Sequence, residues 1–191
     1  MLLFAVLQLS ANAQQTYQMD IKKSKIIWST GKTMGKHTGD IRFSSGTLNY
    51  AKPGKITNGS FKIDMNSMRA IEKEAADFQR VNKELKSSTF FDVVKHPTAT
   101  MQVKQVSSTV NVDVYKVNGD LTIKGITHPI SFLATIKKTG NEVRAMANLK
   151  IDRIKWNINH QQKRTTFNII DIVKDKAMAD EIPISLDLWF Y

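Results

Sequence analysis

Apolar and polar residues alternate along most of the chain, and this alternation predicts a protein built mainly from β-strands. Successive side chains of an extended strand point to opposite faces, so a period of two indicates strands with one buried and one solvated face. Several of these segments exceed the usual strand length of about five or six residues. The pattern predicts about eight strands, over residues 24–30, 39–48, 61–68, 97–106, 115–123, 130–138, 143–152 and 181–190.

The period of two breaks between residues 69 and 86, where apolar residues recur at helical spacing. Glu and Lys fill the opposite face, so the segment predicts one amphipathic helix. Residues 166–177 are compatible with a short helix or with an ordered loop. The apolar face of the predicted helix carries Ile71, Ala75, Phe78, Val81 and Leu85.

Short turns separate the strands at residues 52–55, 124–125 and 139–141. Such connections imply antiparallel hairpins. A meander of eight long antiparallel strands leaves exposed edges unless it closes, so the sequence predicts an eight-stranded barrel. Small residues on the apolar faces favour an internal cavity over a filled core: Ala99, Gly119, Ala134, Ala145 and Ala147.

A histidine-proline pair occurs twice, as His96-Pro97 and as His128-Pro129. Proline has no N–H and suits the first residue of a strand, so both pairs are interpreted as rigid strand starts. Gly125, just before the second pair, tolerates a positive φ in the turn. The functional alternative places His128 at the mouth of the barrel, beside the polar head of a ligand.

The first 13 residues form an apolar stretch that ends in Ala11-Asn12-Ala13. The stretch is too short to span a bilayer, and its end has the small-residue pattern that a signal peptidase cuts. We therefore expect a signal peptide over 1–13 and one domain over 15–191, in a periplasmic or secreted protein. The alternative interpretation is a buried N-terminal strand.

The chain has 191 residues, no cysteine and a net charge of +11. This length suits one domain, and the lack of cysteine excludes disulfides and cysteine-ligated metals. The positive charge favours anionic partners, but the basic residues are scattered rather than clustered. We expect no nucleic acid partner for an exported protein, a possible peripheral contact with an anionic membrane, and a monomer or homodimer.

Six segments of the chain together resemble the YceI-like family of lipocalin-like barrels associated with polyisoprenoid binding. The resemblance implies an all-β fold with one helix: an eight-stranded antiparallel lipocalin-like barrel with an internal apolar cavity. It also implies export and an isoprenoid chain, a prenyl quinone or another amphiphilic lipid as ligand. The segments lie at 37–48, 59–68, 85–101, 119–132, 151–158 and 175–188.

The sequence offers no constellation for catalysis or for a cofactor. The four histidines do not pair at metal-ligand spacing, and neither a nucleophile elbow nor a phosphate-binding glycine motif is present. We therefore expect a non-enzymatic protein with no metal and no cofactor. Two alternatives stay open: an adaptor with a filled barrel, and an enzyme acting on a small lipid.

The expected ligand site combines the inward faces of the strands with a few residues near the ends of the barrel. Trp28 and Trp156 could stack on a chain or quinone ring, or serve only in packing. Arg153 suits a phosphate or quinone oxygen of the ligand head, with Trp156 and His37 as the other candidates, or else holds Asp152 or a loop. The ligand-binding candidates are Trp28, His37, Phe43, Phe61, Ile63, Met65, Met101, Leu121, Phe132, Leu149, Arg153, Trp156 and Leu186.

Overall fold

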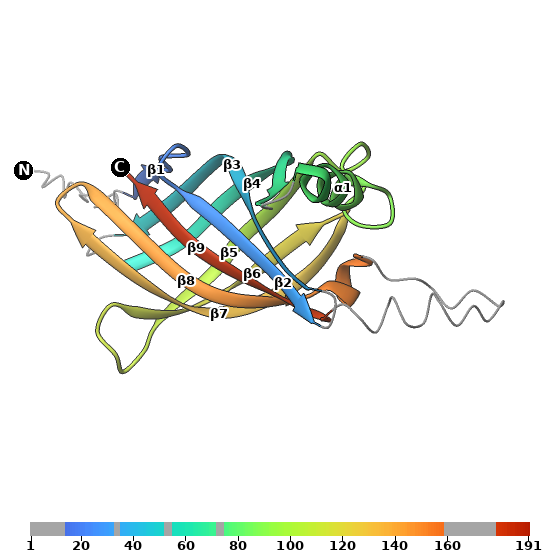
Figure 1. The fold of residues 1–191 in the computed structure, drawn as a ribbon. Coiled ribbons are helices and arrows are strands. Elements are labelled where there is room, and N and C mark those ends of the chain that lie inside the picture. Colours follow the sequence, from blue (N-terminus) through green and yellow to red (C-terminus); the bar gives the residue numbers. More distant parts are fainter. Residues whose placement is uncertain (1–13, 33–34, 52–54, 72–74, 159–178) are drawn as a thin grey trace, which may run out of the picture.

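The computed structural model describes residues 14–32, 35–51, 55–71, 75–158 and 179–191. Within these ranges the chain forms long strands, one α-helix and one short 3₁₀ helix, η1 (Figure 1). The elements are β1 (Gln15–Gln18), β2 (Lys25–Lys32), β3 (Gly35–Ala51), β4 (Lys55–Ala70), α1 (Ala75–Lys86), β5 (Thr98–Ser108), β6 (Val114–Ile123), β7 (Ile126–Thr139), β8 (Glu142–Asp152), η1 (Arg153–Trp156) and β9 (Glu181–Phe190).

The strands form a closed eight-stranded antiparallel barrel, as the sequence predicts. The order β1-β3-β2-β9-β8-β7-β6-β5-β4 closes through an additional pairing between β3 and β4. β1 was not expected as a separate strand, and it adds no further position to the barrel. β1 pairs with the last part of β3 and β2 with its first part, so the two strands share one side of β3.

The two ends of the barrel differ. Helix α1 and η1 lie at one end, whereas the C-terminus and the connection between β5 and β6 lie at the other (Figure 1). Val81 and Leu85 of α1 are buried in the apolar core. The helix therefore covers the barrel at its end and leaves the wall to the strands.

The helix starts later than the sequence predicts. Helical spacing suggested a start at residue 69, but β4 continues through Ala70 and α1 begins at Ala75. Gly39 of β3 pairs with Ala70, and tertiary pairing of this kind overrides a local periodicity. Ile71 is consequently outside the helix and 58% exposed, and Phe78 is 41% exposed, so neither is part of a buried helix face.

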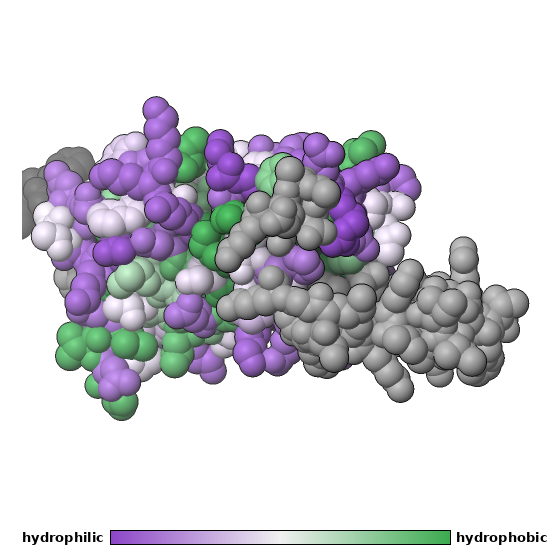
Figure 2. All heavy atoms as spheres, in the orientation of Figure 1, coloured by the Kyte–Doolittle hydropathy of each residue, from purple (hydrophilic) through white to green (hydrophobic). Residues whose placement is uncertain are grey.

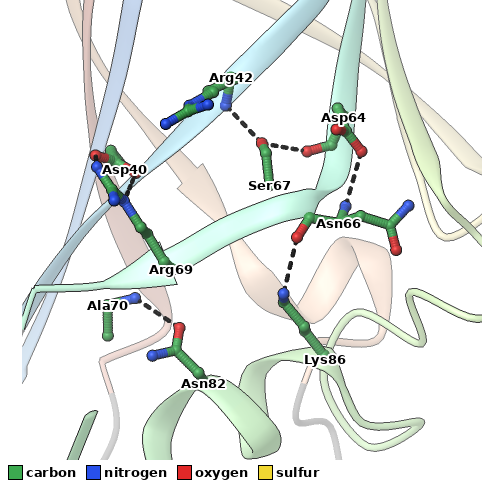
Figure 3. Close-up of polar contacts among 9 residues, drawn as sticks. All are labelled: Asp40, Arg42, Asp64, Asn66, Ser67, Arg69, Ala70, Asn82 and Lys86. Carbon is green, nitrogen blue, oxygen red and sulfur yellow. Dashed lines mark hydrogen bonds and ion pairs between the residues drawn. The ribbon is translucent and has the colours of Figure 1, made fainter. Parts of the chain in front are cut away.

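Polar contacts hold the end of β4 against β3 (Figure 3). Arg69 donates two hydrogen bonds of 2.7 Å to the carboxylate of Asp40 on β3. The Ser67 hydroxyl accepts from the Arg42 amide at 2.8 Å and donates to the Asp64 carbonyl at 2.6 Å. These contacts bridge a register shift between the two strands.

Two further contacts join β4 to α1 (Figure 3). The Ala70 amide donates to the Asn82 side-chain oxygen at 2.9 Å, and the Lys86 ammonium donates to the Asn66 carbonyl at 2.8 Å. Ala70 is fully buried. Asn82 thereby satisfies a buried amide at the point where the strand ends.

The turn between β6 and β7 has the conformation that its sequence indicates, but Pro129 does not start the strand. Lys124 and Gly125 have φ angles of 52° and 72°, which match a tight hairpin with two positive φ values. β7 already begins at Ile126, so Pro129 lies inside it, opposite Asp120. Pro97, in contrast, directly precedes β5.

Gly119 does not leave space in the barrel, contrary to the sequence-based expectation. A Cβ atom there would collide with the Gln102 backbone oxygen and lie 2.6 Å from the Met101 methyl group. The β5–β6 register shifts between Val103 and Gln105, directly beside this glycine. Gly119 therefore permits a close approach of two strands at a bulge.

Two sequence-based expectations lie outside the described residues. These are the signal peptide over 1–13 and the short helix or ordered loop over 166–177.

Candidate ligand-binding cavity

The barrel encloses a cavity of about 180 Å³ whose lining is apolar apart from one hydroxyl side chain, Thr30. Every strand from β2 to β9 contributes to the lining, and α1 contributes Leu85. An apolar cavity of about 150 Å³ stays dry and accepts small hydrocarbons in proteins where this has been tested. The interior can therefore accept an apolar guest without removing bound water from polar groups.

Alanines create much of this space, as the sequence predicts. Ala134 on β7 pairs with Ala147 on β8, and both side chains line the cavity. Ala99 and Ala145 line it too. Larger side chains at these positions would fill the interior, so the cavity argues against the alternative of a filled barrel.

Ten of the expected ligand-binding residues line the cavity. The alternation of apolar and polar residues therefore indicated the inward face of these strands correctly. Contact between the ten residues and a ligand remains a prediction. The ten are Trp28, Phe43, Phe61, Ile63, Met65, Met101, Leu121, Phe132, Leu149 and Leu186.

Arg153 is not presented at the mouth of a tunnel as expected, because its side chain is 1% exposed and bonded to protein groups. Nη2 donates to the Asp180 carboxylate at 3.0 Å, and Nε donates to the Ala179 carbonyl at 3.2 Å. Nη1 donates to the Ile158 carbonyl at 3.2 Å. These contacts join the end of β8 to the start of β9 and favour the structural interpretation of Arg153.

Trp156 is likewise a packing residue at the end of the barrel and does not line the cavity. It is 1% exposed, and its Nε1 donates to the Leu121 carbonyl at 3.3 Å. The His128 ring meets the indole edge to face, with 5.3 Å between centroids. His128 Nε2 also donates to the Lys155 carbonyl at 3.0 Å. His128 therefore fastens η1 to β7, which favours its structural interpretation.

These residues occupy a gap in the wall between β7 and β8. The pairing of the two strands begins at Ala134 and Ala147. In the part of the chain that the structure describes, residues 126–133 have no strand partner on the side away from β6. Pro129 fits this edge because it supplies no N–H for a partner strand. Ile130 and Phe132 line the cavity here and are only partly buried.

His37 lies on β3 opposite Thr30 of β2. Its side chain is partly buried and is not among those that line the cavity. Its role as a contact for a ligand head group remains a prediction.

Thr30 and Trp28 line the cavity with apolar atoms, and each also carries a polar group whose surroundings the sequence did not reveal. Thr30 is the polar member of an otherwise apolar lining. Trp28 is 6% exposed, and among the described residues its buried Nε1 has no hydrogen-bond partner. Alternation alone could have placed Thr30 inward, since it shares the face of Trp28.

Among the described residues, no charged side chain lines the cavity. Hydrogen bonds from Arg69 lower the pKa of the Asp40 carboxyl, and those from Arg144 lower the pKa of the Asp187 carboxyl. Burial raises the pKa of the Tyr50 phenol to about 12. The interior therefore offers no fixed charge that could neutralise a charged ligand.

Lys124 is a partly buried cation at the α1 end. Its ammonium donates to the Asn157 carbonyl at 2.8 Å and to the Ser88 carbonyl at 3.3 Å. Burial lowers the pKa of Lys124, and the nearby Asp92 charge acts in the opposite direction. The hydrogen bonds join the β6–β7 turn to the segments after α1 and after η1, so Lys124 has a structural role.

Among the described residues, no group of three or more histidine, aspartate or glutamate residues is arranged to hold a metal ion. Within the same residues, no helix has the length and apolar character needed to cross a membrane.

The closed antiparallel barrel encloses an apolar cavity, and a barrel of eight strands can hold one small ligand in such an interior. Residues 17–190 match the YceI-like domain, so the chain belongs to the YceI-like family. The resemblance seen in the sequence is thereby confirmed. Family and fold together support a binding protein of the YceI-like type.

The matches between this chain and its relatives known from sequence cover only part of each relative. A UPF0312 protein of Pseudomonas paraeruginosa is 36% identical over 93 residues, which are 44% of this chain and 48% of the relative. A UPF0312 protein of Azotobacter vinelandii is 34% identical over 61 residues, which are 32% of this chain and 31% of the relative. The chain thus matches about half, or less, of the length of these relatives.

Solved structures share the fold. BcnA of Burkholderia cenocepacia has a TM-score of 0.73 at 21% identity, and the match covers 90% of this chain and 98% of that one. The YceI protein of Campylobacter jejuni has a TM-score of 0.55 at 16% identity, covering 99% of this chain and 90% of that one. At these identities the similarity establishes the barrel and nothing about the ligand.

Proposed function

We propose that this protein is a non-catalytic binding protein that takes an isoprenoid-type or other amphiphilic lipid into its barrel. The observation that carries the proposal is the continuous apolar lining of the cavity, interrupted only by Thr30. Burial contributes roughly 0.8 kcal/mol for each methylene transferred from water. Each isoprene unit that is buried therefore contributes roughly 4 kcal/mol without specific polar contacts. A cavity of about 180 Å³ holds only a small hydrocarbon as it stands, so a chain of several units requires the lining side chains to move apart.

The lining favours a neutral ligand over a charged one. An ionised group moved into an apolar interior loses its hydration, and among the described residues no charged side chain lines the cavity to compensate. A prenyl quinone or a prenyl alcohol fits this chemistry. A polyprenyl phosphate fits only with its phosphate kept in solvent beyond the end of the barrel.

The proposal places the protein in the periplasm or outside the cell. The basis is the apolar leader that the sequence predicts over 1–13, with its small-residue end. In such a compartment a barrel of this kind would carry or buffer apolar molecules between membranes. The net charge of +11 favours contact with anionic membrane surfaces during that exchange.

The direct test is to identify what the barrel contains. Protein purified without detergent from exported material would be extracted with organic solvent, and the extract analysed by mass spectrometry against an extract of a purified control protein. We expect a prenyl lipid enriched near one molecule per protein. Delipidated protein should then bind a neutral prenyl quinone more tightly than a prenyl phosphate of equal chain length.

Two results would contradict the proposal. One is protein that is consistently empty and shows no affinity for any prenyl lipid. The other is a specific ligand that is small, polar and bound on the outer surface. A preference for the phosphate over the quinone would keep lipid binding but would reject the neutral ligand class.

A further inference from the structure

The connection between β5 and β6 exposes two valines to solvent. Val110 is 100% exposed and Val112 is 88% exposed. The connection extends from the end of the barrel opposite α1 (Figure 1), and hydrophobic side chains gather at the corresponding corner of the surface (Figure 2). We call residues 109–113 the valine tip.

The valine tip is a defined structure held by its own hydrogen bonds. The Thr109 hydroxyl donates to the Val114 carbonyl at 2.8 Å and accepts from the Asn111 amide at 3.2 Å. The Ile136 amide of β7 donates to the Asp113 carbonyl at 2.8 Å. These bonds hold the backbone of the connection, while both valine side chains are exposed. Two apolar side chains held in solvent at a protruding tip indicate an interaction site.

Lysines flank the valine tip on β6 and β7. Lys116 lies on β6 opposite Leu133 of β7, and Leu133 is itself 57% exposed. Lys137 and Lys138 follow on β7, directly after the residue that bonds the tip. Among the described residues, neither Lys116 nor Lys137 has an acidic partner within ion-pair distance.

Lys138 and two tyrosines continue the same end of the barrel. The Lys138 ammonium lies 5.1 Å from the centre of the Tyr17 ring and 5.6 Å from that of Tyr50. Tyr191, 65% exposed, ends the chain on the same side as β1, to which it is hydrogen bonded. Tyr17 and Tyr50 are themselves buried, so the lysines supply the exposed polar groups at this end. An apolar tip flanked by exposed lysines has the chemistry of a peripheral membrane contact.

We propose that the valine tip inserts at the surface of an anionic membrane. Val110 and Val112 enter the boundary between head groups and acyl chains, while Lys116, Lys137 and Lys138 contact the lipid phosphates. The barrel then stands with its α1 end pointing away from the bilayer. This contact would not require an occupied cavity, so it can hold or fail independently of lipid binding inside the barrel.

Vesicle co-sedimentation tests the proposal with the full mature chain. Vesicles of phosphatidylcholine with roughly one third phosphatidylglycerol would be compared with pure phosphatidylcholine, at low and high salt. We expect binding only to the anionic vesicles, and weaker binding at high salt because the surface charge is then screened. The double variant Val110→Ser/Val112→Ser should bind roughly tenfold more weakly, because it removes the apolar insertion.

Val94 provides a matched control, because it is 93% exposed and lies on the connection between α1 and β5 at the opposite end. Val94→Ser should leave vesicle binding unchanged. Lys116→Gln/Lys137→Gln should weaken binding to anionic vesicles and reduce its salt dependence. All variants change exposed side chains, so unchanged thermal unfolding would verify that they are folded.

Several results would overturn the proposal. One is that the native chain does not bind anionic vesicles, and another is that it binds neutral vesicles equally well. A third is that Val94→Ser and the valine double variant lose equal amounts of binding to anionic vesicles. The chain could also fail to bind vesicles but bind a second protein, and lose that protein in the Val110→Ser/Val112→Ser variant. This result would assign the valine tip to a protein partner instead.

Discussion

Arg153 and Asp180 join the end of β8 to the start of β9 through a hydrogen bond of 3.0 Å between Nη2 and the carboxylate. Arg153 is 1% exposed, whereas Asp180 is 65% exposed. Arg153→Ala would leave the Ile158 and Ala179 carbonyls without their donors. We expect a loss of about 3 kcal/mol in unfolding free energy, measured by chemical denaturation. Asp180→Asn, which removes only an exposed charge, should cost about 1 kcal/mol or less.

Ligand affinity separates the structural interpretation of Arg153 from a role at the head group. The structural contacts predict that Arg153→Ala binds phosphate-headed and plain prenyl chains as the native protein does, at temperatures where both are folded. A selective loss for the phosphate-headed ligand would instead support the sequence-based expectation of a head-group site. Isothermal calorimetry with a matched pair of ligands gives the answer.

Ala147 tests whether the ligand occupies the cavity. Ala147→Leu places additional methyl groups among the lining residues and should weaken binding of a prenyl quinone at least fivefold, while unfolding free energy changes by about 1 kcal/mol. The next residue, Asn148, is exposed on the outer face, so Asn148→Leu is the control and should leave affinity unchanged. Equal affinity of both variants would show that the ligand is bound elsewhere.

The sequence predicts the strands and their inward faces well, because one rule governs both. A strand with one buried face must alternate, so residues such as Phe61 and Leu186 could be assigned to the interior from parity alone. Trp189 has the opposite parity to Leu186 and Leu188 of the same strand. It faces outward between Arg144 and Lys23, whose charged groups lie 4.5 and 5.5 Å from its ring.

The predictions that were wrong concern features that depend on contacts between segments distant in the sequence. The helical spacing after residue 69 could not reveal that Ala70 pairs with Gly39. The surroundings of Arg153 depend on Asp180, which lies 27 residues away along the chain. Local pattern therefore predicts the barrel and its lining, but not which polar residues serve the structure and which face a ligand.

Gly119 gives a test of the close approach between β5 and β6. In Gly119→Ala the new Cβ meets the Gln102 backbone, which cannot move without disturbing the strand pairing. We expect a loss of about 1–3 kcal/mol in unfolding free energy. Gly46→Ala is the control, because its nearest neighbours at 2.9 Å are side-chain atoms of Met19 and Phe61. It should cost less, and an equal cost at both positions would contradict the proposed role of the Gln102 backbone.

Asp187 and Arg144 give the barrel a predictable response to acid. Two hydrogen bonds of 2.9 Å link the guanidinium to the carboxylate, and they hold the pKa of Asp187 below its ordinary value. A carboxyl whose pKa is lower in the folded state stabilises the fold fully above its unfolded pKa of about 3.9. This contribution decreases as the pH falls through the lower, folded pKa.

Asp187→Asn should therefore be less stable than the native protein by a constant amount at pH 5–8, and the difference should shrink below about pH 4. Chemical denaturation at a series of pH values measures it. Asp40→Asn, which removes the carboxylate bound by Arg69, should show the same dependence because the pKa of Asp40 is also lowered. A difference that grows as the pH falls would contradict the assignment. So would an Asp187 carboxyl that titrates, in the folded protein, at or above the pKa of an unfolded aspartate.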